Sequence, residues 1–258
     1  MKIGITGKGG VGKTFLSATL CRLFEKNGYK VIAVDADPDM NLGCALGINE
    51  EITPISKMND LIEERTGSKV GEYGGVFKLN PKVDDIVDNY SYKVGNIHLL
   101  VMGTIEKGGE GCVCPASVLL RRLLKHIILK RNEVVILDME AGIEHLGRKT
   151  TESVDFMIVV VEPSKKSLLT SERIKKLSKD LNIPNVLAVI NKVKSKEELN
   201  IFLKEFKKLD IPVIGTISYS DEVSSCDLYG KPIDLESKVG KEVEKIFNKL
   251  IELKNKAK

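Results

Sequence analysis

The chain has 258 residues, of which 42% are apolar, and this length suits one large or two small domains. Its 40 basic and 36 acidic residues leave a net charge of +4, which is too balanced to indicate nucleic acid as a partner. Because no apolar run approaches the roughly 18 residues of a membrane span and the N-terminus does not resemble a signal peptide, we expect a cytoplasmic protein. We expect it to bind neither membrane nor nucleic acid.

Short β-branched runs alternate with helical patterns along the chain. We expect strands at Lys2–Thr6, Lys30–Asp35, Asn96–Gly103, Glu133–Asp138, Phe156–Glu162, Val186–Asn191 and Val213–Ser218. Helical patterns occupy 13–28, 115–130, 164–181 and 195–209. Apolar strands separated by amphipathic helices predict an α/β fold, in which a mostly parallel sheet is flanked by helices on both faces.

The chain shows no linker, so we predict one domain over residues 1–258. Residues 53–95 depart from the alternation, with a helix candidate at Met58–Arg65 followed by a glycine-rich segment. We predict that this segment is an insertion lying over one edge of the sheet. The apolar positions of the C-terminal pattern are Val243, Ile246, Phe247, Leu250 and Leu253. They predict a final helix that packs on the sheet rather than one that binds a membrane.

The sequence GKGGVGKT, residues 7–14, follows the first predicted strand and opens the first predicted helix, which is the context that a phosphate-binding P-loop requires. Glycines let backbone N–H groups turn toward an anion, and the helix N-terminus adds its positive end. In such a loop Lys13 reaches the outer phosphates and Thr14 offers its hydroxyl to Mg²⁺. The residues expected to bind ATP here are Gly9, Gly10, Val11, Gly12, Lys13, Thr14 and Phe15.

The lysine at position 8 makes this loop resemble the deviant Walker A motif of the MinD/ParA family, in the SIMIBI class of P-loop ATPases. In that family the extra lysine reaches across a dimer to the phosphates of the other subunit. The resemblance therefore implies a catalytic role for Lys8 in a homodimer joined by ATP. Phe15 stands where the family usually has a hydroxyl residue, so only its main-chain N–H is expected to contribute.

Further segments resemble the same family where predicted strands end. DADPDMNLG, residues 35–43, resembles switch I and implies that Asp37 orients the water that attacks the terminal phosphate. Asp35 and Asp39 are less specific, because acidic residues after a strand often only form loops. The segment around Asp138 resembles Walker B and switch II, implying that Asp138 holds the water shell of Mg²⁺. By the same resemblance, Asn191 reads adenine and Ser218 closes over the base.

Two of the five cysteines, Cys112 and Cys114, stand one residue apart before a predicted helix. In an extended segment they lie on one side of the chain, with Cα atoms about 7 Å apart. Two thiolates are half of a four-ligand site, and a dimer supplies the other half, which suits tetrahedral Zn²⁺ or square-planar Ni²⁺. The alternative is a coincidental pair of small residues at a helix start. Cys21 and Cys44 are predicted to be core residues, and Cys226 has no partner by spacing.

GGEGCVCP together with DMEAGIEHLGR resembles the CooC-type nickel-insertion ATPases, which serve carbon monoxide dehydrogenase, and their relatives that serve acetyl-CoA synthase. This resemblance implies that ATP hydrolysis gates dimerisation and the transfer of Ni²⁺ to an apo-enzyme. Two alternatives stay open. One is an Fe–S reductase like the nitrogenase iron protein, although its second cluster ligand falls near His145 here. The other is a positioning ATPase like MinD or ParA.

Overall fold

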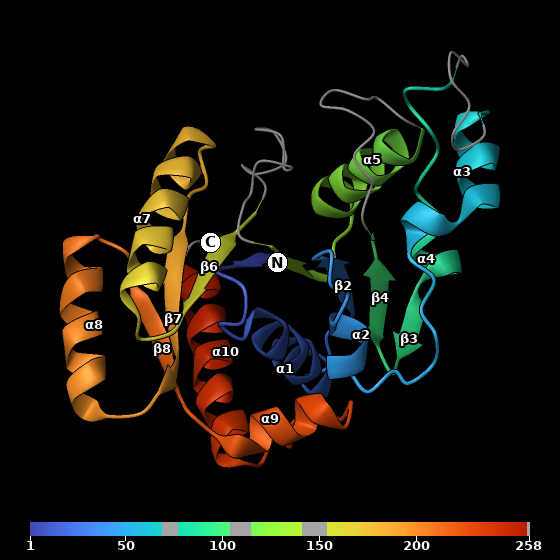
Figure 1. The fold of residues 1–258 in the computed structure, drawn as a ribbon. Helices are drawn as coiled ribbons and strands as arrows, with labels where there is room; N and C mark the ends of the chain where they lie inside the picture. The colour runs from blue at the N-terminus through green and yellow to red at the C-terminus, as the bar shows by residue number, and fades with distance from the viewer. Residues whose placement is uncertain (69–76, 104–114, 141–153, 257–258) are drawn as a thin grey trace.

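The computed structural model describes residues 1–68, 77–103, 115–140 and 154–256, and its core is one sheet (Figure 1). The strands are β1 Lys2–Thr6, β2 Val31–Ala36, β3 Tyr92–Val94, β4 Ile97–Val101, β5 Val134–Met139, β6 Phe156–Val161, β7 Val186–Val193 and β8 Val213–Ser218. Their order in the sheet is β3-β4-β2-β5-β1-β6-β7-β8. The β3–β4 pair is antiparallel and the other neighbours are parallel, so the predicted mostly parallel sheet is confirmed.

Helices cover the sheet on both faces (Figure 1). They are α1 Lys13–Lys26, α2 Leu42–Ala45, α3 Asn59–Thr66, α4 Ile86–Tyr90, α5 Pro115–Lys130, α7 Lys165–Asp180, α8 Lys196–Lys208, α9 Asp221–Leu228 and α10 Lys238–Lys256, with a short 3₁₀ helix at Ile55–Lys57. Each predicted strand and helical pattern has a counterpart within a few residues. The sequence patterns did not predict β3, α2, α4, α9 or the 3₁₀ helix.

Alternate residues of a strand pack into different cores, because successive side chains point to opposite faces of the sheet. In β2, Val31 and Ala33 join α1 and α10 in one core, whereas Ile32 and Val34 join α3 and α5 in another. A third core lies under α7 and α8, on the strands β6 and β7. Because both faces of the sheet are covered, its strands carry continuous apolar runs.

The apolar face of the C-terminal helix α10 packs against α1 and β8, which confirms the predicted packing on the sheet. Val243, Ile246 and Leu250 are fully buried beside α1 and β8. The ring of Phe247 meets that of Phe24 on α1 edge to face, with ring centroids 4.9 Å apart. Within the described ranges, no helix is both long and apolar enough to cross a membrane.

The described part of residues 53–95 gathers at the β4 end of the sheet (Figure 1). Its helix α3 packs against α5, α4 packs against β4, and β3 pairs with β4 as an antiparallel edge strand. Burial of Ile62 and Ile86 joins this segment to the core that contains α5.

The strand order brings together the carboxyl ends of β1, β2 and β5. Strand β5 lies between β1 and β2, with Asp138 opposite Ile5 on one side and Asp35 on the other. The chain leaves β1 toward β2 on one side, and β6 lies on the other side. Ligands of open α/β sheets bind at such a reversal of strand order.

Candidate nucleotide-binding site

The P-loop leaves β1 and ends at the first turn of α1. Gly10 and Gly12 have φ angles of 77° and 94°, in the left-handed region that favours glycine. Val11 between them is fully buried and anchors the loop in the core. A Cβ atom at Gly9 or Gly10 would meet nothing within 4 Å, so open space borders these two residues. Gly12 gives α1 no side-chain cap, which leaves N–H groups of the first turn available to an anion.

The end of β7 holds the P-loop from the other side. The Asn191 amide donates to the Val11 carbonyl at 2.8 Å, and the Lys192 ammonium donates to the Gly10 carbonyl at 2.6 Å. A Cβ atom at Gly12 would lie only 2.2 Å from Asn191 Nδ2. The sequence indicated Asn191 as a contact to the base but gave no signal for Lys192. The backbone of Lys192 has an unusual φ of 58°, which no sequence pattern predicts.

The structure brings together Lys13 of the P-loop and Asp37 of switch I. Lys13 Nζ lies 3.4 Å from Asp37 Oδ2, and the two side chains are only 7% and 13% exposed. The other carboxylate oxygen of Asp37 accepts a hydrogen bond from Asp39 N at 3.2 Å. The Lys13 ammonium of the P-loop therefore faces the Asp37 carboxylate of switch I.

Asp138 is a buried carboxylate with free coordination capacity. It is 0% exposed, and neither carboxylate oxygen has a hydrogen-bond partner among the described residues. Burial raises the pKa of Asp138 to about 6, while the neighbouring Thr14 hydroxyl and Lys13 ammonium favour its charged form. Unpartnered buried oxygens need an explanation, and oxygen ligands beside a threonine hydroxyl suit hydrated Mg²⁺. Thr14 and Asp138 therefore fit the predicted magnesium site.

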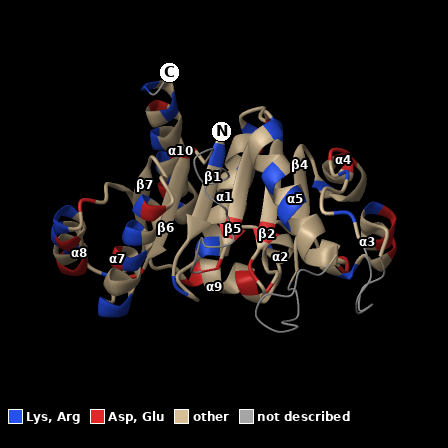
Figure 2. Cartoon of the chain, turned by 90° about the horizontal axis from the view of Figure 1, so that it is seen from above, with Lys and Arg blue, Asp and Glu red and all other residues tan. Residues whose placement is uncertain are grey.

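Asp35 lies beside Asp138 on the neighbouring strand, where Figure 2 shows acidic positions at the ends of β2 and β5 side by side. Its carboxylate accepts hydrogen bonds from Leu42 N at 2.9 Å and Asp37 N at 3.2 Å. Burial, and then the charge of Asp138, raise the pKa of Asp35 to about 7. Asp35 itself lies in β2, and its carboxylate supports the loop that carries Asp37. The D-x-D spacing of an Asx turn was the available signal.

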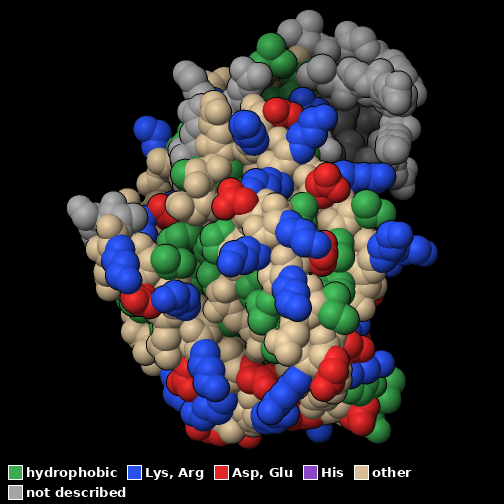
Figure 3. All heavy atoms as spheres, turned by 90° about the vertical axis from the view of Figure 1, so that its left-hand side faces the viewer, with side chains coloured by type: hydrophobic (Ala, Val, Ile, Leu, Met, Phe, Trp, Pro, Cys, Tyr) green, Lys and Arg blue, Asp and Glu red, His purple; other side chains and the backbone are tan. Residues whose placement is uncertain are grey.

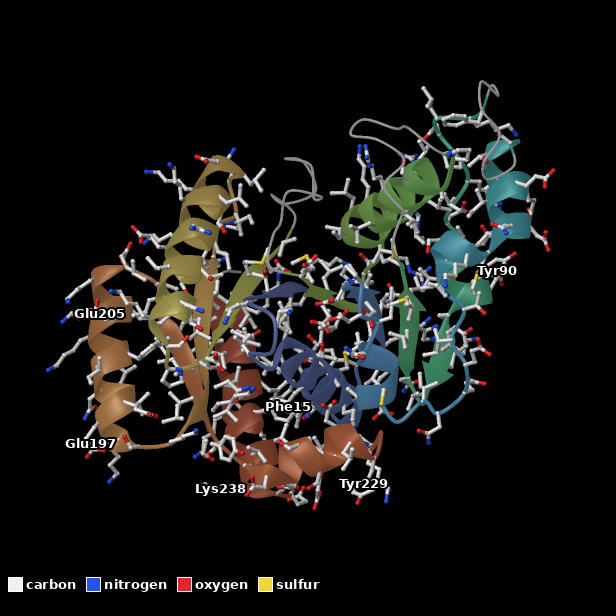
Figure 4. All side chains as sticks on the ribbon, viewed as in Figure 1. Phe15, Tyr90, Glu197, Glu205, Tyr229 and Lys238 are labelled. Atoms are coloured by element: carbon white, nitrogen blue, oxygen red, sulfur yellow. The ribbon has the colours of Figure 1, made fainter. Side chains whose placement is uncertain are left out.

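The remaining predicted residues are Ser218 on β8, Phe15 on α1 and Lys8 in the P-loop. Ser218 N and Oγ both donate to the carboxylate of Glu242 on α10, at 2.8 and 3.0 Å. Glu242 carried no sequence signal, because only the fold brings α10 to β8. Phe15 is partly buried on α1, on the side toward α9 (Figure 4). Lys8 is half-buried and makes no hydrogen bond or ion pair within the part of the chain that the structure describes.

The cysteines have different outcomes. Cys112, Cys114 and His145 lie outside the described residues, so their predicted roles stay predictions. Within the described ranges, no three His, Cys, Asp or Glu side chains gather to hold a metal ion. Cys21 is buried in the core as predicted. The core prediction for Cys44 was wrong, since α2 is one short turn whose inner face is filled by Leu42 and leaves Cys44 exposed.

The sequence of this chain is similar to those of known nucleotide-binding proteins. Residues 3–233 match the model of the CobQ/CobB/MinD/ParA nucleotide binding domain. An uncharacterized ATP-binding protein of Methanocaldococcus jannaschii is 63% identical, with 99% of each chain covered. The carbon monoxide dehydrogenase accessory protein CooC of Rhodospirillum rubrum is 43% identical, covering 89% of this chain and 88% of CooC.

Solved structures agree on the fold. The MinD cell division protein of Aquifex aeolicus superposes with a TM-score of 0.70, at 20% identity over 98% of each chain. A ParA family ATPase of Chlorobium tepidum also gives 0.70, at 17% identity over 96% of this chain and 97% of that one. The strand order, the P-loop and the sequence matches agree: the chain belongs to the CobQ/CobB/MinD/ParA family of nucleotide-binding ATPase domains and is a relative of CooC.

Proposed function

We propose that this protein is an ATP-dependent metallochaperone that binds nickel and assists its insertion into carbon monoxide dehydrogenase or acetyl-CoA synthase. The observation that carries the proposal is the 43% identity to CooC, an accessory protein of carbon monoxide dehydrogenase, over nearly the full length of both chains. The Cys112-x-Cys114 pair adds soft ligands of the kind that nickel and zinc prefer.

The nucleotide part of the proposal assigns the triphosphate to the P-loop, with Asn191 and Ser218 toward the base. Lys13 is paired with Asp37 at 3.4 Å. The phosphate oxygens of ATP compete for the same ammonium, so binding frees Asp37 to orient the attacking water. Binding of ATP therefore prepares the site for hydrolysis.

Magnesium belongs to the same proposal. Thr14 would supply a hydroxyl, and the unpartnered Asp138 carboxylate would accept hydrogen bonds from the waters around the ion. When bound, Mg²⁺ neutralises charge that develops on the phosphates.

The dimer and the metal cargo are linked in this mechanism. The Lys8 side chain has no partner among the described residues, which leaves its ammonium available to the phosphates of a second chain. Two chains joined in this way contribute Cys112 and Cys114 twice, and the four thiolates hold one Ni²⁺ as cargo. Loss of the terminal phosphate relaxes switches I and II, separates the chains and releases the metal to the apo-enzyme.

The proposal is tested by measuring bound metal after equilibrium dialysis against Ni²⁺ or Zn²⁺, with and without ATP. We expect wild-type protein to bind one ion per two chains. Cys112→Ser/Cys114→Ser should bind none and keep its affinity for ATP. The matched control is Cys44→Ser/Cys226→Ser, which removes two thiols elsewhere and should keep full binding. Stoichiometric metal in the Cys112→Ser/Cys114→Ser protein would show that the assigned ligands are wrong.

Activity toward a client is measured separately. Metal-free carbon monoxide dehydrogenase or acetyl-CoA synthase, incubated with Ni²⁺, ATP and this protein, should gain activity faster than without the protein. An anaerobically purified protein that is brown and absorbs visible light would instead support the Fe–S reductase. ATP-dependent sedimentation with liposomes or DNA would support a positioning ATPase.

A further inference from the structure

Asp35 is a buried carboxylate whose backbone is fixed from both sides of β2. The neighbouring strands place Val101 and Asp138 opposite it. The Asp35 carbonyl also accepts a hydrogen bond from Met102 N at 2.8 Å. With the side chain 0% exposed, its carboxylate has a fixed place at the carboxyl edge of the sheet.

The two oxygens of this carboxylate bind the two ends of the switch I turn, residues 37–42. Oδ1 accepts from Asp37 N at 3.2 Å, and Oδ2 accepts from Leu42 N at 2.9 Å. Leu42 begins α2, and the preceding Asn41 supplies no side-chain cap. Asp35 therefore ties both ends of the turn to the edge of the sheet.

The turn between these ties contains a residue in an unusual backbone conformation. Met40 has a φ of 50°, in a region that non-glycine residues rarely adopt. Met40 N donates to the Asp37 carbonyl at 3.1 Å, and Asp39 N donates to the Asp37 carboxylate at 3.2 Å. The same conformation leaves Asp37 Oδ2 facing Lys13 at 3.4 Å.

We propose that Asp35 is a positioning residue for ATP hydrolysis, which sets the place of the Asp37 carboxylate opposite Lys13 by holding Asp37 N and Leu42 N. This inference rests on the proposed role of Asp37 in orienting the attacking water. A carboxylate is required because it has two acceptor oxygens, whereas an asparagine amide has one and presents donors on its other side. Both of these hydrogen bonds to the Asp35 carboxylate come from switch I, so its effect falls on the chemical step and spares nucleotide binding.

The first test compares Asp35→Asn with wild type, measuring kcat and the Kd for MgATP separately. We expect kcat to fall by at least about tenfold, because small misplacements of a catalytic group are costly, while Kd changes by less than about threefold. Asp60→Asn is the matched control, since it makes the same chemical change at an exposed position on α3, outside switch I, and it should keep the wild-type kcat. A loss of ATP affinity as large as the loss of kcat would overturn the proposal.

The second test asks whether Asp35 acts through Asp37, using Asp35→Asn, Asp37→Asn and the double variant. If it does, adding Asp35→Asn to Asp37→Asn lowers kcat by less than about twofold. Losses that multiply would show that Asp35 acts independently of Asp37, and the proposal would fail. A wild-type kcat in Asp37→Asn would instead contradict the proposed function, so the two failures are distinguishable.

Folding is checked by thermal melting. If Asp35→Asn is unfolded at the assay temperature, Asp35→Ala takes its place, because it removes a buried carboxylate together with both acceptors. The same cycle then applies. A wild-type kcat in Asp35→Ala would refute the positioning role.

Discussion

At the scale of single residues, the site is organised around two buried carboxylates on neighbouring strands. Asp35 and Asp138 are both 0% exposed, and they face each other in the register of β2 and β5. Asp35 satisfies its oxygens with two backbone N–H groups, whereas those of Asp138 have no partner among the described residues. One carboxylate therefore supports the backbone of the site, and the other remains available to a ligand.

The burial of Asp138 predicts a pH-dependent stability. Its pKa is raised from 3.8 to about 6, so the folded state binds more protons than the unfolded state between these values. The stabilising contribution is complete below pH 3.8 and is lost as the pH rises past about 6. A shift of about two units corresponds to about 3 kcal/mol. Asp138→Asn cannot ionise, so its melting temperature relative to wild type should rise between pH 4 and 7, measured with EDTA and without nucleotide.

The control for this measurement is Asp39→Asn, the same change at an exposed position, whose difference from wild type should stay flat. A flat difference for Asp138→Asn as well would mean that Asp138 is not desolvated in the folded protein.

At the scale of elements, the P-loop is supported by β7 as well as by β1 and α1. The carbonyls of Gly10 and Val11 accept hydrogen bonds from Lys192 and Asn191. Gly12 passes so close to Asn191 that no Cβ atom fits between them. The glycine at position 12 is thus required by a neighbour from another element as well as by its own φ angle.

Gly12→Ala should therefore destabilise the protein and abolish ATP binding. The left-handed conformation alone costs an alanine roughly 1–2 kcal/mol, and the Cβ atom displaces Asn191 from Val11. At about 2–4 °C per kcal/mol, this strain alone should lower the melting temperature by about 2–8 °C. Gly9→Ala is the matched variant for stability, because its Cβ atom meets nothing, and it should melt within about 1 °C of wild type. Equal melting of the two variants would exclude this contact.

At the scale of the whole molecule, a single chain contains half of the proposed dimer and half of its proposed metal ligands. On the face formed by α7 and α8, Lys, Arg, Asp and Glu side chains are intermixed, and the part visible in Figure 3 has no continuous basic patch. The P-loop, in contrast, borders open space at Gly9 and Gly10, next to Lys8, whose side chain has no partner among the residues that the structure describes. The second chain is expected to dock on this side.

Lys8→Ala should leave ATP binding to each chain largely intact but abolish ATP-induced dimerisation. The physical reason is that the Lys8 ammonium offsets the charge of phosphates held by the other chain. Light scattering with ATP is the measurement, on the Asp37→Asn background so that ATP persists. Lys204→Ala, an exposed lysine on α8, is the control and should dimerise normally. A Lys8→Ala dimer of undiminished affinity would rule out the lysine bridge.

The features that the sequence determined by itself are those that depend on neighbours along the chain. The apolar run of β2 and the amphipathic pattern of α10 predict their elements, because burial repeats with the period of a strand or a helix. The P-loop is local for the same reason, since one loop contains the glycines, Lys13 and Thr14. Cys112 and Cys114 remain a prediction of this local kind.

Only the tertiary structure decided which residues meet across the sheet. Asn191 donates a hydrogen bond to the carbonyl of Val11, which lies 180 residues earlier in the sequence. Ser218 donates to Glu242 of α10, and Asp35 lies opposite Asp138 on the neighbouring strand. It also left Cys44 exposed, where the sequence had suggested a core position. The physical reason is that these contacts follow from the order of the strands in the sheet. That order depends on which distant strands pair, and the local period of each strand carries no information about its partner.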